Sequence, residues 1–217
     1  MITTCGIEVN PNQIIAIQQL HLPNNPKEVQ QLIGMIVALN RFVSRLTDRC
    51  RPFYQLLKKW KGFQWTEECD SAFKDLKSYL ANPPNLSRPE SEEDLYMYLA
   101  VSDHAISLVL IRQHEMAQRP MYYLNKTLVD AETRYLPLEK MVLALVHAIR
   151  KLPHHFQGHT IWVLTEYPLQ SLLKGSDFTG RIAKLGMFNV HYKPKNSIKG
   201  QCLQTLWLSL PLIPRVS

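Results

Sequence analysis

Residues 132–151 constrain the fold of this chain most, because they combine an almost wholly apolar helix with one carboxylate at its start. The apolar side chains recur at helical spacing, which is typical of a helix buried in a core: Leu138, Met141, Val142, Leu145 and Ile149. Glu139 stands two residues after Pro137, at the start of this helix. Glu139 has two open interpretations, an acid that stabilises the helix dipole or an acid that takes part in chemistry.

Length and composition predict an ordinary folded protein. The 217 residues, 46% of them apolar, allow one or two domains with a proper core. No apolar run reaches the roughly twenty residues that span a bilayer, and the N-terminus has no signal-peptide pattern. We therefore expect an intracellular protein, cytoplasmic or nuclear, with no membrane partner. The cysteines form no Cys-x-x-Cys pair, which predicts free thiols rather than a zinc site or disulfides.

The basic residues suggest a polyanionic partner. The formal net charge is +7, and no acid follows Asp177. Such a surface favours nucleic acid through phosphate neutralisation, although an ordinary solvated face can have the same composition. The candidate nucleic-acid contacts are Arg41, Arg45, Lys184, Lys193 and Lys195.

Capping residues and prolines predict short helices over residues 1–90. Asn10-Pro11 and Asn25-Pro26 each place a capping residue before a proline at the first helical position. The apolar stripe from Val29 to Val43 predicts a helix with a basic exit at Arg41, Arg45, Arg49 and Arg51. Thr66 is expected to cap a further helix, which the Asn-Pro-Pro-Asn run at 82–85 ends.

From Leu95 onward the pattern changes to short β-branched and aromatic runs. These runs predict strands over residues 95–101, 106–111, 121–124, 161–165 and 188–192. The helix of 132–151 and a helical stretch at 169–173 complete the order β-β-β-α-β-α-β. This order predicts an α/β fold with a mixed five-stranded sheet packed by helices.

Two other groups of side chains fit a structural interpretation better than a functional one. The histidines near the helix exit have no acid beside them and are expected to be solvated: His154, His155 and His159. The spacing of Trp65, Trp162 and Phe73 predicts core positions rather than base-stacking ones.

Several motifs resemble the Pol polyprotein of plant gypsy-type LTR retrotransposons. Val-Gln-Gln-Leu-Ile-Gly at 29–34 and Leu-Asn-Arg-Phe at 39–42 resemble the thumb of its reverse transcriptase. Phe-Gln-Trp-Thr at 63–66 resembles the segment that joins the thumb to RNase H. The RNase H-like domain of the family is similar to residues 99–110, 135–139 and 163–169. The resemblance implies thumb and connection helices over 1–90 and an RNase H-like domain over 91–200. The fingers and palm would precede Met1, so this chain is not expected to polymerise.

The resemblance also implies a site for two divalent cations, Mg²⁺ or Mn²⁺, held by clustered carboxylates. Ala100 stands where the first metal-ligating aspartate belongs, and Asp103 matches a later acid of that motif. Glu139 matches the second acid, although Leu136 replaces the usual hydroxylated N-cap. Glu166 replaces the third acid, an aspartate.

The C-terminal residues depart from the resemblance. The fourth acid should follow Lys-Gly-Gln at 199–201, but residues 203–210 read Leu-Gln-Thr-Leu-Trp-Leu-Ser-Leu. A nucleotide string for these residues, read one base earlier, can encode Leu-Ala-Asp-Phe-Val-Ala-Glu-Phe. We therefore predict a frameshift near Cys202 and an out-of-frame tail over 201–217; the alternative is an ordinary apolar C-terminus. The segment 184–188 is also about four residues short, which predicts the loss of one helical turn.

Two functions follow from the resemblance. The first is a non-catalytic RNase H-like connection module that holds an RNA–DNA hybrid or other nucleic acid for an attached polymerase, as in plant lineages with a second RNase H downstream. The second is a metal-dependent RNase H endonuclease that uses Glu139, Glu166 and Asp103. We favour the first, because Ala100 and the altered tail remove metal ligands, and we do not expect a stably bound cation.

Overall fold

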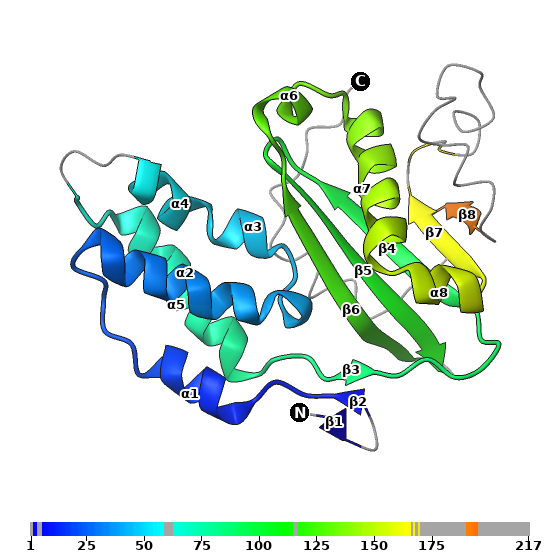
Figure 1. Cartoon of the computed structure of the whole chain (residues 1–217), viewed down its shortest axis with the longest axis horizontal. Coiled ribbons are helices and arrows are strands. Elements are labelled where there is room, and N and C mark those ends of the chain that lie inside the picture. Colours follow the sequence, from blue (N-terminus) through cyan, green and yellow to red (C-terminus); the bar gives the residue numbers. More distant parts are fainter. Residues whose placement is uncertain are drawn as a thin grey trace.

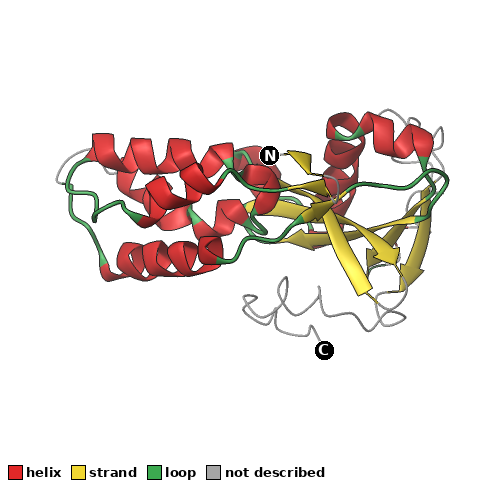
Figure 2. Ribbon diagram, turned by 90° about the horizontal axis from the view of Figure 1, so that it is seen from below, coloured by secondary structure: helices red, strands yellow, loops and turns green. Residues whose placement is uncertain are grey.

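The computed structural model describes residues 2–3, 6–58, 63–114, 117–165, 167, 169 and 190–194. A helical part and a sheet part lie side by side along the long axis of the molecule (Figure 2). The helical part contains α1 (Pro11–Gln18), α2 (Pro26–Ala38), the 3-10 helix η1 (Asn40–Phe42), α3 (Leu46–Arg49), α4 (Arg51–Lys58) and α5 (Glu67–Ala81). The sheet part contains β4 (Leu95–Val101), β5 (Ala105–His114), β6 (Ala117–Thr127), α6 (Asp130–Thr133), α7 (Pro137–Lys151), α8 (Pro153–Gly158), β7 (Ile161–Thr165) and β8 (Val190–Pro194).

The predicted capping residues start the helices. The Asn25 side chain accepts a hydrogen bond from the Glu28 backbone N–H at 3.0 Å, and the Glu28 carboxylate accepts one from the Asn24 N–H at 2.7 Å. Thr66 Oγ1 likewise accepts from the Cys69 N–H at 3.3 Å, at the start of α5. Both contacts satisfy N–H groups that have no partner inside a helix.

The helix expected over 29–43 ends early, so that expectation was wrong. α2 stops at Ala38, and the chain continues through η1 into α3. The Tyr79 hydroxyl holds this bend, because it donates to Phe42 O at 3.1 Å and accepts from the Ser44 N–H at 3.3 Å. Val43 is fully buried within the same bend. Packing against α5 therefore overrides the continued apolar periodicity.

The sheet is the mixed five-stranded sheet that the sequence predicts, with strand order β6-β5-β4-β7-β8. β4 pairs antiparallel with β5 and β5 with β6, whereas β4–β7 and β7–β8 are parallel pairs. A second small sheet was not predicted: β1 (Ile2–Thr3), β2 (Gly6–Ile7) and β3 (Leu86–Ser87). Its two-residue strands are too short for alternation to show in the sequence.

The two faces of the large sheet contact different partners. α7 and α8 cover one face, as Figure 1 shows, and pack on Met97 and Leu99 of β4. The opposite face shares a core with the helical part through Tyr98, Val109 and Ile111. Because side chains alternate along a strand, Ala100 belongs to the same face as Tyr98. Within the described residues, no helix combines the length and apolar character needed to cross a bilayer.

Asn125 joins the two parts of the molecule. Its amide nitrogen donates to Asn40 Oδ1 and to Val43 O, both at 2.9 Å. Its amide oxygen accepts from the Leu46 backbone N–H at 3.0 Å and from the Ser107 hydroxyl. One side chain on β6 therefore satisfies polar groups of the bend between α2 and α3, which would otherwise lie unpaired at a buried interface.

A second polar contact joins the same elements. Ser102 Oγ donates to Asp48 Oδ1 at 2.8 Å, across the boundary between β4 and α3. The other Asp48 oxygen accepts from Arg45 Nε at 3.1 Å and pairs with Arg45 Nη2 at 3.0 Å. Asp48 is thus shared between a sheet residue and a residue of the bend, which fixes α3 against the sheet.

We expect Asn125→Leu to lower the free energy of unfolding by about 2–4 kcal/mol, because it leaves several buried polar groups without a partner. Urea denaturation followed by circular dichroism measures this change. Asn85→Leu, at an exposed position, is the matched control and should change stability by less than about 0.5 kcal/mol. Equal stability of the two variants would contradict the role assigned to Asn125.

Candidate metal centre and nucleic-acid contacts

Ala100 lies in a row of three side chains that runs across the sheet. The strand register pairs Ala100 with Ser107 and Ser107 with Asn125. We call these three residues the docking row, because Asn125 and Ser107 belong to the contact with the helical part. Ala100 is 9% exposed and its methyl group offers no metal ligand. The position that would carry the first acid is therefore a buried position on the face that meets the helical part.

Glu139 lies at the start of α7, where the sequence predicts it. Its Oε2 accepts a hydrogen bond from the Leu136 backbone N–H at 2.8 Å. Leu136 is the N-cap residue and its side chain cannot accept a hydrogen bond, so only the glutamate half of a capping box is formed here. This geometry supports the helix-stabilising interpretation of Glu139. α7 also packs on the sheet face opposite to Ala100.

The remaining candidate acids do not complete a metal site in the described residues. Asp103 is exposed on the turn between β4 and β5. Glu166 and the C-terminal tail lie outside the described residues. Across the described segments, no group of three or more His, Cys, Asp or Glu side chains could hold a metal ion. An alanine, a glutamate engaged in capping and an exposed aspartate do not fit a centre that needs clustered carboxylates.

Lys140 is a charged residue that we did not single out from the sequence. It is only 5% exposed, and its Nζ donates to Ser102 O at 3.3 Å and Asp103 O at 3.2 Å. The signal was available, since Ala144 and Ala148 follow on the same helix face and are fully buried. Helical spacing therefore placed this lysine on the buried side of α7.

Among the candidate nucleic-acid contacts, the three that the structure describes do not gather at one place. Arg41 is exposed at the helical part, with its guanidinium 5.6 Å from the Tyr122 ring centre on β6. Arg45 is 7% exposed and paired with Asp48, so its guanidinium is not presented to a ligand. Its backbone is left-handed, with φ 51°. The expected surface role of Arg45 does not fit a side chain that is buried and paired with Asp48.

Lys193 lies at the far edge of the sheet from Arg41. Its Nζ is 3.6 Å from the Trp162 ring centre, and the Trp162 ring stacks on His191 at 4.6 Å. Arg41 lies near β6 and Lys193 is on β8, so four strand spacings of roughly 4.8 Å separate them. Lys184 and Lys195 lie outside the described residues.

A cleft of about 370 Å³ opens between α4 and the sheet part. Arg51 and Lys58 of α4 line one wall, and the other carries His104, Thr127 and Thr133. The remaining lining residues include two acids, Asp48, which is already paired with Arg45, and Asp130. Basic side chains opposite hydroxyl groups are the combination that binds phosphate oxygens.

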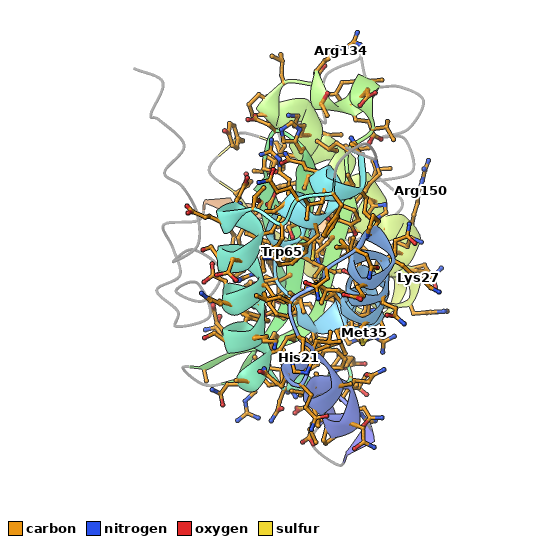
Figure 3. The ribbon with its side chains drawn as sticks, turned by 90° about the vertical axis from the view of Figure 1, so that its left-hand side faces the viewer. His21, Lys27, Met35, Trp65, Arg134 and Arg150 are labelled. Carbon is orange, nitrogen blue, oxygen red and sulfur yellow. The ribbon has the colours of Figure 1, made fainter. Side chains whose placement is uncertain are left out.

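Other aromatic and histidine side chains have structural contacts. Trp65, labelled in Figure 3, lies just before α5; it stacks on Phe53 at 5.9 Å and meets Phe73 edge-on at 6.1 Å. The predicted core position is confirmed for Phe73, which is buried, whereas Trp65 and Trp162 are both only half-buried. His155 is half-buried, and burial, together with neighbouring histidines, lowers the pKa of its imidazole. It is therefore less solvated than we expected.

Comparison with known proteins agrees with this arrangement. The family described as "RNase H-like domain found in reverse transcriptase" matches residues 65–163. The matched residues therefore resemble an RNase H-like domain of that kind. The domain includes α5, the three antiparallel strands, α7 and most of β7. Its match begins inside the segment that we expected to be thumb and connection.

Similar proteins come from transposons and retroviruses. The chain is 27% identical to the retrovirus-related Pol polyprotein from transposon 297 of Drosophila melanogaster, over 79% of this chain and 16% of that protein. It is 26% identical to the retrovirus-related Pol polyprotein from transposon opus of the same fly, over 91% of this chain and 22% of that protein. The chain is 24% identical to the Gag-Pol polyprotein of feline leukemia virus, over 73% of this chain and 9% of that protein. The chain thus resembles a piece of Pol and spans less than a quarter of these relatives.

Solved structures show the same fold. The foamy viral protease-reverse transcriptase in complex with an RNA/DNA hybrid gives a TM-score of 0.72 at 21% identity, covering 91% of this chain and 28% of that one. A related complex with double-stranded DNA gives 0.73, also at 21% identity, over 91% and 37%. The match therefore includes the helical part as well as the RNase H-like domain.

We expect Ala100→Asp to destabilise the protein by about 3 kcal/mol, because it buries a carboxylate in the docking row. Added Mg²⁺ should not restore the melting temperature, since no described acid clusters with position 100. Ala131→Asp, at an exposed position of α6, makes the same change without burial and should be almost neutral. A Mg²⁺-dependent rise in the melting temperature of Ala100→Asp alone would show that a metal site can be rebuilt there.

Proposed function

We propose that this piece of a Pol polyprotein is a non-catalytic connection module that holds an RNA–DNA hybrid beside an attached polymerase part. The main support for this role is the docking row of Ala100, Ser107 and Asn125. Position 100, which the resemblance assigns to a metal ligand, is an alanine on the face that packs against the helical part through Asn125. A face committed to this contact supports a structural role for the RNase H-like domain rather than hydrolysis.

The nucleic-acid partner is supported by charge and by the similar structures. The chain carries a formal net charge of +7, and Arg51 and Lys58 face the cleft between α4 and the sheet part. The similar foamy viral structures are complexes with double-stranded DNA and an RNA/DNA hybrid. We propose that this cleft contacts phosphates of the hybrid through Arg51 and Lys58, and that Arg45, which is paired with Asp48, takes no part.

The wider context is also part of the proposal. The motifs at 29–34 and 63–66 support a plant gypsy-type element as the source, and the fingers and palm of the same polyprotein as the partner of the helical part. We propose an intracellular location, cytoplasmic or nuclear. A Mg²⁺ or Mn²⁺ ion of the family would have to be held by Glu139, Glu166 and Asp103. The two described residues among these, Glu139 and Asp103, do not form a metal site.

Hybrid binding tests the cleft. We expect the double variant Arg51→Ala/Lys58→Ala to bind a labelled RNA–DNA hybrid more weakly and to reduce the slope of log K against log salt by about 2, one unit for each lost phosphate contact. The matched control is Lys27→Ala/Arg150→Ala, whose side chains project from α2 and α7 (Figure 3) and make the same charge change. Equal slopes for the two double variants would reject the cleft, and no salt-sensitive binding by the unmodified chain would reject the hybrid.

Nuclease activity tests the non-catalytic role. With Mg²⁺ or Mn²⁺ present, we expect the unmodified chain and the Glu139→Ala variant to show the same absence of hybrid cleavage. The described acids do not form a two-metal centre. A cleavage activity that disappears with Glu139→Ala and survives Lys151→Ala would establish the alternative function, an active RNase H endonuclease.

A further inference from the structure

The buried ammonium group of Lys140 is the least expected charge in the RNase H-like domain. Nζ donates to two backbone carbonyls of the turn after β4, Ser102 O and Asp103 O. None of the acids in the described segments lies within 4.0 Å of Nζ as an ion-pair partner. Lys140 therefore keeps its charge buried with carbonyl dipoles as its described partners.

This placement opposes the usual preferences of a lysine. Burial removes the ammonium group from water, and this loss of hydration costs free energy. Lys140 is also the fourth residue of α7, close to the positive end of the helix dipole. Carbonyl oxygens are typical ligands of hard cations, and two of them converge on Nζ. The two carbonyl oxygens thus bind the Lys140 ammonium group in the way that such oxygens bind a free cation.

The position of this cation relates it to the metal centre that the resemblance implies. Ser102 and Asp103 follow directly on β4, two and three residues after Ala100, and Glu139 precedes Lys140 on α7. The ammonium therefore lies between the two segments to which the first and second metal ligands are assigned. It joins them, as a metal ion bound by both segments would.

We infer that the Lys140 ammonium group takes the place of a divalent metal ion and holds the β4–β5 turn to α7. Its positive charge also excludes a divalent ion from this position. The repulsion follows from Coulomb's law, because a fixed positive charge in a poorly solvated site raises the energy of a divalent cation placed beside it. The structure of the domain is then independent of Mg²⁺ and Mn²⁺. This inference stands apart from hybrid binding, which it does not require.

Manganese binding by the unmodified full chain tests the exclusion. Electron paramagnetic resonance of added Mn²⁺ should show the signal of the free ion undiminished by the protein, and the melting temperature should be the same in EDTA, Mg²⁺ and Mn²⁺. Saturable loss of the Mn²⁺ signal that Glu139→Gln abolishes would overturn the inference. Hybrid retention in EDTA, measured on the same samples, keeps the outcome separate from that of the proposed function.

Lys140→Met tests the structural role, because it keeps the apolar stem and removes the charge and donors. We expect its melting temperature to fall by about 5 °C or more. Lys151→Met is the matched control on the same helix, at an exposed position, and should melt within about 1 °C of the unmodified chain. Lys140→Gln is compared by the same criterion if Lys140→Met does not fold. Melting equal to the Lys151→Met control would overturn the inference.

Discussion

The Asn125 side chain determines how the two parts of this protein meet. It is fully engaged with the bend between α2 and α3 on one side and with Ser107 on the other. A partly buried amide between a sheet and a bend is favourable only when its donors and its acceptor are all satisfied. The bend itself exists because Tyr79 holds it against α5. The contact therefore depends on tertiary packing in both parts and joins them into one unit.

This contact has a consequence for chemistry. An RNase H-like sheet used for catalysis needs its acid-bearing positions to be open to substrate and metal, and here position 100 lies in the docking row beneath the contact. The start of α7 also makes structural contacts, since Glu139 accepts from the Leu136 N–H and Lys140 donates to the turn carbonyls. In the described residues these elements form a joint between the helical part and the sheet part.

The sequence predicts the sheet well because its strands carry strong local patterns. β4 and β7 have the bounds that their β-branched and aromatic runs indicate, and Pro137 marks the start of α7. The bend after Ala38 was missed because buried residues continue the helical period beyond the end of the helix. Asn125 and Lys140 were missed for a related reason, since the value of a polar residue depends on partners more than thirty residues away. The resemblance located position 100, but only the strand register shows what it faces.

Native-state hydrogen exchange of the Leu46 amide tests most directly whether the helical part and the RNase H-like domain form one unit. This N–H donates to Asn125 Oδ1 across the contact. If the two parts form one unit, this amide exchanges only through global unfolding, with the same free energy as the buried amides of β5. Exchange of Leu46 at a much lower free energy than β5 would show that the helical part separates from the sheet, which would contradict the docking row as a committed face.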